Sequence, residues 1–144
     1  MFNDERKKDF FVNLSHGPIM VVEYFSGYKV NGYRFHTKAR NEGKATYNCG
    51  VCQRNEVSGD YYGILHEIIR VKFTGEPIKK CVLFNCEWFD LDVPRGLRYP
   101  KFIPYPEVNH TRRYRKFDVF IFANTATQVV SVKYPEGISG KVNW

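Results

Sequence analysis

The 144-residue sequence lacks several patterns that identify whole classes of protein. No apolar run approaches the roughly 20 residues that a transmembrane helix needs, so we expect no helical membrane span and no membrane partner. The first residues, MFNDERKKDFFVN, are charged and contain no apolar stretch, so we expect no secretory signal. Four cysteines are too few for a disulfide scaffold of this size, which predicts a reducing compartment.

Catalytic motifs are also lacking. The sequence contains no nucleophile elbow, no phosphate-binding glycine loop and no His-rich metal motif. Asp90 and Asp92 have a spacing that can hold a divalent metal, but such a pair at a strand end is more typical of a turn. Cys86 and His66 have no visible third group that would orient the imidazole. We therefore predict that the protein is not an enzyme and needs no cofactor.

Positive charge is present in excess, and it is concentrated in one stretch. The chain has 22 Lys+Arg against 15 Asp+Glu, yet residues 93–116 hold seven of the basic residues and a single acid, Glu107. Four of the seven prolines lie in the same stretch, together with four aromatic residues. Because proline fixes φ and removes a backbone donor, we predict a long, semi-rigid loop rather than a central strand or a helix.

This basic-aromatic segment is the leading candidate for a binding site. Arginine and lysine neutralise phosphates, and interleaved tyrosines stack on bases. The alternative is a solvated loop that only keeps the protein soluble. The predicted nucleic-acid-binding residues are Arg95, Arg98, Lys101, Arg112, Arg113, Tyr114, Arg115 and Lys116. Arg34, His36 and Lys38 on one strand face would extend the patch, although an ordinary solvent face is the simpler interpretation.

Short strands dominate the rest of the chain. Asn31-Gly32 between YKV and YRF predicts a tight hairpin turn, because both positions need φ > 0. Residues 61–73 are compatible with a helix or a strand, and their isoleucines and glycines favour a strand. Further strands are predicted over residues 19–25, 33–38, 45–53 and 78–90, with a last pair over 117–123 and 129–134 joined by a short helical turn. The pattern predicts an all-β barrel or sandwich over residues 17–144, after a linker or flexible segment at 1–16.

Three stretches, VNGYRFHTK, YYGILHEI and VLFNCEWFD, resemble a plant domain of unknown function, number 4216, and the resemblance spans roughly residues 14–144. That domain accompanies the transposases of CACTA (En/Spm-type) elements and genes derived from them. The resemblance implies nuclear, DNA-associated biology and no particular activity, since the catalytic core of such transposases belongs to a separate domain.

The order of the strands is also similar to that of bromo-adjacent-homology and related chromatin barrels. In those barrels, a strand like YYGILHEI is followed by a strand that ends in an aromatic pair like Trp88-Phe89, and a phrase like FIFAN comes later. We therefore expect a small SH3-like or bromo-adjacent-homology-like barrel of six or seven short strands, with the Pro-rich basic loop attached.

Two other sites deserve a test. An aromatic cage for a methylated lysine would use Tyr61, Tyr62, Trp88 and Phe89, with Tyr114 nearby. Cys49 and Cys52 have zinc-knuckle spacing, and Cys81 and Cys86 would complete four thiolates. However, Cys81 and Cys86 are an odd number of residues apart, so a regular strand points them to opposite faces. We therefore predict no metal site.

The sequence as a whole predicts a non-catalytic, nuclear module of a CACTA transposase-related protein that binds DNA through residues 95–116. One alternative is a reader of methylated histone tails that uses the aromatic cage. Another is a protein-interaction domain that contacts other nuclear proteins. Three outcomes distinguish these functions. A DNA-binding module predicts affinity that depends steeply on salt, and a histone-tail reader predicts binding that depends on lysine methylation. A protein-interaction domain predicts neither.

Overall fold

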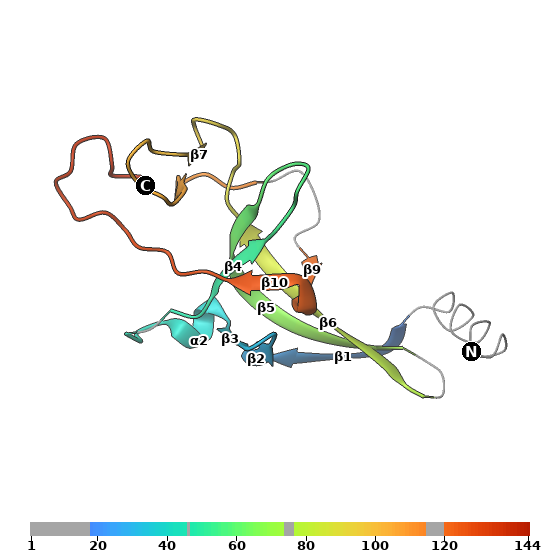
Figure 1. Cartoon of the computed structure of the whole chain (residues 1–144). Coiled ribbons are helices and arrows are strands. Elements are labelled where there is room, and N and C mark those ends of the chain that lie inside the picture. Colours follow the sequence, from blue (N-terminus) through green and yellow to red (C-terminus); the bar gives the residue numbers. More distant parts are fainter. Residues whose placement is uncertain (1–17, 46, 74–76, 115–119) are drawn as a thin grey trace.

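The computed structural model describes residues 18–45, 47–73, 77–114 and 120–144, so the predicted linker at 1–16 lies outside the described residues. Nearly all of the regular structure is β (Figure 1). The elements are β1 (Pro18–Phe25), β2 (Gly27–Val30), β3 (Tyr33–His36), α2 (Lys38–Asn41), β4 (Gly50–Gln53), β5 (Tyr61–Phe73), β6 (Lys79–Trp88), β7 (Leu97–Arg98), β8 (Glu107–Val108), β9 (Phe120–Phe122), a 3-10 turn η1 (Ala123–Thr125) and β10 (Ala126–Gln128).

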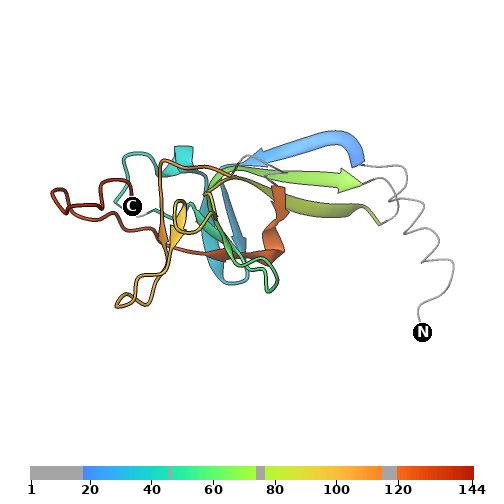
Figure 2. The same cartoon turned by 90° about the horizontal axis from the view of Figure 1, so that it is seen from above.

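The antiparallel pairing of β5 with β6 forms the centre of the fold. It runs from Phe73↔Lys79 to Gly63↔Trp88, with an irregularity between Leu65 and Glu67. Strand β4 pairs with the first part of β5, and β1 pairs with its second part. The sheet order is therefore β10-β4-β5-β6-β9, with β1 also beside β5. Strands β1, β5 and β6 extend together beyond the rest of the sheet (Figures 1 and 2).

The β2–β3 hairpin supplies a second layer over one face of this sheet. Asn31 has φ 51° and Gly32 has φ 80°, which confirms the predicted Asn-Gly turn. Phe35 on β3 packs edge-on against Phe84 on β6, with ring centroids 4.9 Å apart. Both rings are fully buried, whereas Arg34 between the inward-facing residues is exposed. Alternation along the strand thus places the hydrophobic residues of the hairpin over the core.

The described residues confirm the predicted all-β class but not the predicted barrel. The strands divide into one six-stranded sheet and two separate two-stranded ladders, and none of these described sheets closes on itself. We expected closure because it removes sheet edges, which otherwise pair with other chains. Here β9 and β10, at the two ends of the sheet order, are only three residues long, and short edge strands also limit such pairing.

The predicted pairing of 117–123 with 129–134 is wrong. Strand β9 pairs with β6, and β10 pairs with β4 at the other end of the sheet order. Residues 129–134 form no strand, and Val130 and Val132 are exposed. The alternating pattern of residues 129–134 indicates an extended chain, but it does not identify the strand with which that chain pairs. In the structure, η1 turns the chain so that Ala126 enters the core. Residues 115–119 lie outside the described residues.

Within the described part of the chain, no helix has the length and hydrophobicity needed to cross a membrane.

The contact between Gly63 and Trp88 yields a stability prediction. A Cβ atom at Gly63 would lie 2.7 Å from Cε3 of Trp88 and 2.9 Å from the backbone oxygen of Glu87. Replacing Gly63 with alanine therefore forces the buried indole or the strand to shift, and we expect a loss of about 1–3 kcal/mol in unfolding free energy. Urea unfolding followed by tryptophan fluorescence measures it.

Two variants control this measurement. Val57→Ala, at an exposed loop position, should change the unfolding free energy by less than about 0.5 kcal/mol. Adding Trp88→Phe to Gly63→Ala should make the two losses less than additive, because the smaller ring leaves room for the new methyl group. A Gly63→Ala protein as stable as the original would show that this contact does not limit the strand.

Candidate nucleic-acid interface

Residues 93–116 contain a short β ladder, so they do not form the single irregular loop that the prolines predicted. Leu97 pairs with Val108 and Arg98 with Glu107, which joins β7 to β8. Leu97 is buried and anchors the ladder. Gly96 allows the chain to pass close to the end of β6, because a Cβ there would lie 2.4 Å from the backbone oxygen of Asp90. The ladder therefore holds the excursion between β7 and β8 at both of its ends.

That excursion, residues 99–106, presents aromatic side chains to solvent. Phe102 is 90% exposed, and Tyr99 and Tyr105 are also exposed. The ammonium of Lys101 lies 5.7 Å from the centroid of the Phe102 ring. We call residues 99–106 the aromatic tip. It combines flat hydrophobic rings with positive charge, which is the combination that stacks on bases and contacts phosphates.

The arginines around the tip are paired with carboxylates. Arg112 contacts Asp90, with Nε–Oδ2 and Nη2–Oδ2 distances of 2.9 and 2.8 Å. Arg113 donates from Nε to Glu87 at 2.7 Å and lies over the Phe89 ring, 4.6 Å from its centroid. These contacts fasten residues 112–114 to the end of β6, so both arginines have a structural role that the charge count did not reveal.

Arg95 and Arg98 also have acidic partners. Arg95 contacts Asp92 at 2.7 Å but remains largely exposed. Arg98 lies 3.4 Å from Glu107, and its guanidinium carbon lies 3.3 Å from the centroid of the Trp144 ring. The excess positive charge of residues 93–116 is therefore partly balanced by acidic residues, most of which come from the preceding stretch of the chain.

Glu107 is the electrostatic centre of the ladder. It is only 7% exposed and accepts hydrogen bonds from the Tyr134 hydroxyl and the Lys141 ammonium, while Arg98 lies on its other oxygen. Burial disfavours the charged carboxylate, but the hydrogen bonds from Lys141 and Tyr134 outweigh it and hold the pKa of Glu107 below its ordinary value. The C-terminal segment is thus fastened to the ladder by one buried acid.

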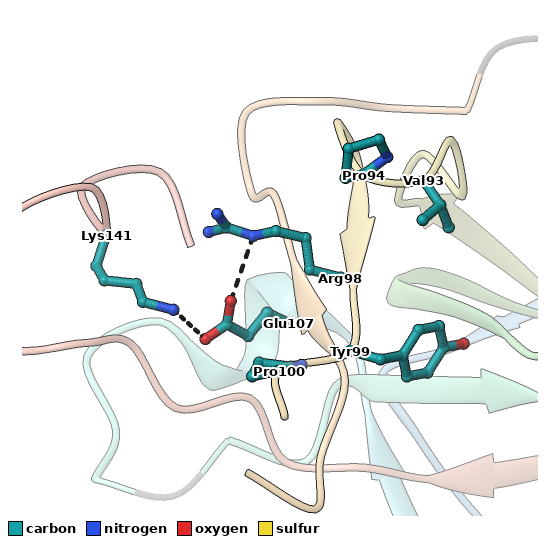
Figure 3. A pocket seen from close by; sticks show the side chains of 7 residues that line it. All are labelled: Val93, Pro94, Arg98, Tyr99, Pro100, Glu107 and Lys141. Carbon is teal, nitrogen blue, oxygen red and sulfur yellow. Dashed lines mark hydrogen bonds and ion pairs between the residues drawn. The ribbon is translucent and has the colours of Figure 1, made fainter. Parts of the chain in front are cut away.

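Arg98, Glu107 and Lys141 also line an open hollow of about 470 Å³ (Figure 3). Glu107 and its two basic partners, Arg98 and Lys141, contribute the charged side of this hollow, as the dashed contacts show. Sequence reasoning missed Tyr134, Lys141 and Trp144 as parts of this region. The available signal was Glu107 itself, the lone acid in a basic stretch, which required a cationic environment.

The predicted binding residues therefore separate into three groups. Lys101 and Arg95 are exposed, although Arg95 also contacts Asp92, whereas Arg98, Arg112 and Arg113 are less exposed and are held in ion pairs. Tyr114 packs edge-on against Tyr61, with ring centroids 6.0 Å apart, and its N–H donates to the backbone oxygen of Trp88. Arg115 and Lys116 lie outside the described residues.

The five proposed cage aromatics do not surround one space. Trp88 is 5% exposed and packs edge-on against Tyr61, while Phe89 is equally buried beneath Arg113. Tyr61 and Tyr62 are neighbours on β5, and Trp88 and Phe89 are neighbours along the chain, so each pair divides between the two faces of the sheet. Burial raises the pKa of the Tyr62 hydroxyl. The geometry is that of packed aromatic residues.

The cysteines lie at separate places in the sheet. Cys49 and Cys86 belong to the hydrophobic core, and Cys52 on β4 pairs with Tyr62 on β5. All four thiols are free, and burial raises the pKa of Cys52, Cys81 and Cys86, which disfavours the thiolate that zinc requires. In the described ranges, no three His, Cys, Asp or Glu side chains are grouped so that they could hold a metal ion.

The acidic pair after β6 forms a turn. The Asp92 N–H donates to Oδ1 of Asp90 at 3.0 Å, and each carboxylate also contacts an arginine. Nε2 of His66 lies 3.0 Å from Oε2 of Glu87, and Cys86 is 1% exposed. Arg34 and Lys38 are exposed on the hairpin and its following turn, while His36 bonds Asn41 at 3.3 Å.

The structure thus defines a β-rich domain in which the two most exposed aromatic residues of the described part, Phe102 and Tyr105, lie in the basic, proline-containing segment. The chain belongs to the family described as Domain of unknown function (DUF4216), whose model matches residues 69–144. The match includes only the last part of β5, from residue 69 onward, together with the whole of β6 and the entire candidate interface. Neither the curated proteins nor the solved structures contain a match to this chain.

The buried carboxylate yields a prediction about pH. Glu107→Gln removes the charge that Lys141 and Arg98 contact, and we expect a loss of about 1–2 kcal/mol in unfolding free energy at pH 7. The pKa of Glu107 in the folded protein lies below its ordinary value of 4.5. The stabilisation from the charged carboxylate is therefore complete above pH 4.5 and is lost as the pH falls through the lowered pKa of the folded protein. The difference between the original protein and the variant should therefore shrink in acid.

Urea unfolding between pH 7 and about pH 3 measures that difference. Glu56→Gln, an exposed glutamate in a loop, is the matched control and should follow the original protein at every pH. A Glu107→Gln protein whose stability deficit stays constant down to the lowest pH would contradict a folded carboxylate with a lowered pKa.

Proposed function

We propose that this protein is a non-catalytic nucleic-acid-binding module that contacts DNA through the aromatic tip and the basic residues beside it. The observation that carries the proposal is the exposure of Tyr99, Phe102 and Tyr105 together with Lys101 on a ladder braced by ion pairs. Large aromatic rings are costly to leave in water, so an exposed group of them is typical of a binding surface.

Single-stranded DNA fits this arrangement better than a duplex. Unpaired bases expose their flat faces and can stack on aromatic side chains without sequence preference, whereas paired bases hide those faces. Lys101 and Arg95 are exposed and can neutralise phosphates of such a strand, and Arg115 and Lys116 follow Tyr114 directly in the sequence. Arg112 and Arg113 contribute indirectly, because their ion pairs hold the segment in place.

The cellular setting is part of the same proposal. The motifs VNGYRFHTK, YYGILHEI and VLFNCEWFD resemble a domain that accompanies CACTA transposases in plants. A DNA-binding module of a transposase-related protein would act in the nucleus and would hold DNA, or DNA-bound partners, while another domain performs the chemistry.

Binding to labelled oligonucleotides over a range of salt concentrations tests the proposal. We expect log affinity to fall linearly with log salt, and single strands to bind more tightly than duplexes of the same length. Phe102→Ala and Tyr105→Ala should each weaken binding about tenfold without changing the salt slope, since a stacked base contributes about 1–3 kcal/mol. Lys101→Ala should reduce the slope by about 0.7, the contribution of one phosphate contact.

Matched controls lie elsewhere on the surface. Tyr47→Ala removes an exposed aromatic residue far from the tip in sequence, and Lys38→Ala removes an exposed lysine beside the hairpin. Both should leave affinity and slope unchanged. Affinity that does not respond to salt, or that survives the loss of both Phe102 and Tyr105, would disprove the assignment to the tip.

A further inference from the structure

The face of the large sheet opposite the core is also apolar. Ile68 and Phe84 point into the core, and alternation therefore turns their neighbours Ile69 and Leu83 to the other side. The same reasoning holds for Tyr24 beside Phe25 on β1. On β9, Ile121 packs against the core, so Phe122 and Phe120 point outward. We call this side the outer face.

Strand register arranges these side chains in two rows across the sheet. The first row is Tyr24, Ile69, Leu83 and Phe122, whose members pair successively from β1 to β9. The second row is Val22, Val71 and Cys81. Neither row contains a charged residue. Tyr24 and Phe122, at the two edges of the first row, are 67% and 56% exposed, whereas Ile69 between them is 8% exposed and Leu83 is half-buried. An apolar surface that spans four strands is larger than isolated exposed hydrophobic residues and indicates an interface.

The two ends of this surface carry side chains of opposite charge. Beyond the first row lies Glu67, which accepts a hydrogen bond from Asn85 at 2.6 Å. Beyond the second row lies Lys79, opposite Phe73 at the far end of the β5–β6 pairing. A two-fold axis that crosses the strands between the rows would bring Glu67 of one copy toward Lys79 of the other. The outer face is therefore complementary in charge to itself.

The rows are also complementary in size. The same two-fold axis places the first row, which consists of large side chains, over the second row, which consists of two valines and a cysteine. Cores pack well when large residues face small ones, and two sheets of equal twist stack naturally about 10 Å apart. A symmetric interface of this kind uses the same patch on both partners.

From these observations we propose that the outer face joins two copies of this chain into a symmetric dimer, with β1, β5, β6 and β9 of each copy stacked on the other. This surface contains none of residues 93–116, so the proposal is independent of the proposed nucleic-acid binding. A dimer would display two aromatic tips, and a longer DNA strand could then engage both.

Sedimentation of the full chain over a concentration series tests the proposal. We expect a species of twice the 17.0 kDa monomer mass that dissociates on dilution. Phe122→Asp and Tyr24→Asp should each weaken the dimer about tenfold or more, because each places a charge where a large aromatic side chain contacts the other copy. Phe102→Asp is the matched control, because it changes an even more exposed phenylalanine that lies outside the outer face.

Charge reversal tests the symmetry. Lys79→Glu and Glu67→Lys should each weaken the dimer, and the double variant should restore it, because the interacting pair then has the reverse polarity. Restoration would not occur if each charge acted only on the folding of its own chain. A double variant that is as weak as the sum of the single variants would overturn the proposed two-fold arrangement.

Cys81 gives a readout that requires no substitution in the interface. It lies in the second row and is the one described cysteine that is not buried. Its reaction with a thiol reagent should slow as protein concentration rises and should be fast in Phe122→Asp at every concentration. A chain that remains monomeric at about 1 mM would overturn the dimer, as would protection of Cys81 that does not depend on concentration.

Discussion

The pairing of β5 with β6 is the interaction on which the rest of the described fold depends. Strands β1 and β4 share the two halves of β5, β9 pairs with β6, and the β2–β3 hairpin packs on Phe84. Gly63 and Trp88 form the close contact near one end of this pairing, and the acidic residues that follow hold the basic segment. One long ladder therefore positions both the core and the candidate interface.

Electrostatic pairing changes the meaning of the basic segment. Counted along the chain, residues 93–116 have a large positive excess, but in space Glu87, Asp90 and Glu107 lie among their arginines. The arginines consequently shape and brace the ladder, and the exposed tip carries the features suited to binding. A high local charge in sequence can thus serve folding through its paired arginines, while our proposal assigns ligand contact to the exposed side chains.

Local signals in the sequence predicted much of the strand content. The Asn31-Gly32 turn and the extended segments at 61–73 and 78–90 depend on φ preferences and alternation, which act over a few residues. The barrel was not confirmed and the final strand pair was wrong, because both depend on which distant strands pair. The arginine partners were equally hidden, because no neighbour in sequence shows that Arg113 contacts Glu87.

By itself, the sequence determined a β-rich chain, its main hairpin turn and the location of its basic, proline-containing segment, since propensity, turn geometry and composition are local properties. Only the tertiary structure decided that the sheet stays open, that Glu107 is buried among cations, and that Phe102 is exposed while Trp88 is not. These outcomes depend on long-range packing, in which each side chain is placed by residues far away along the chain.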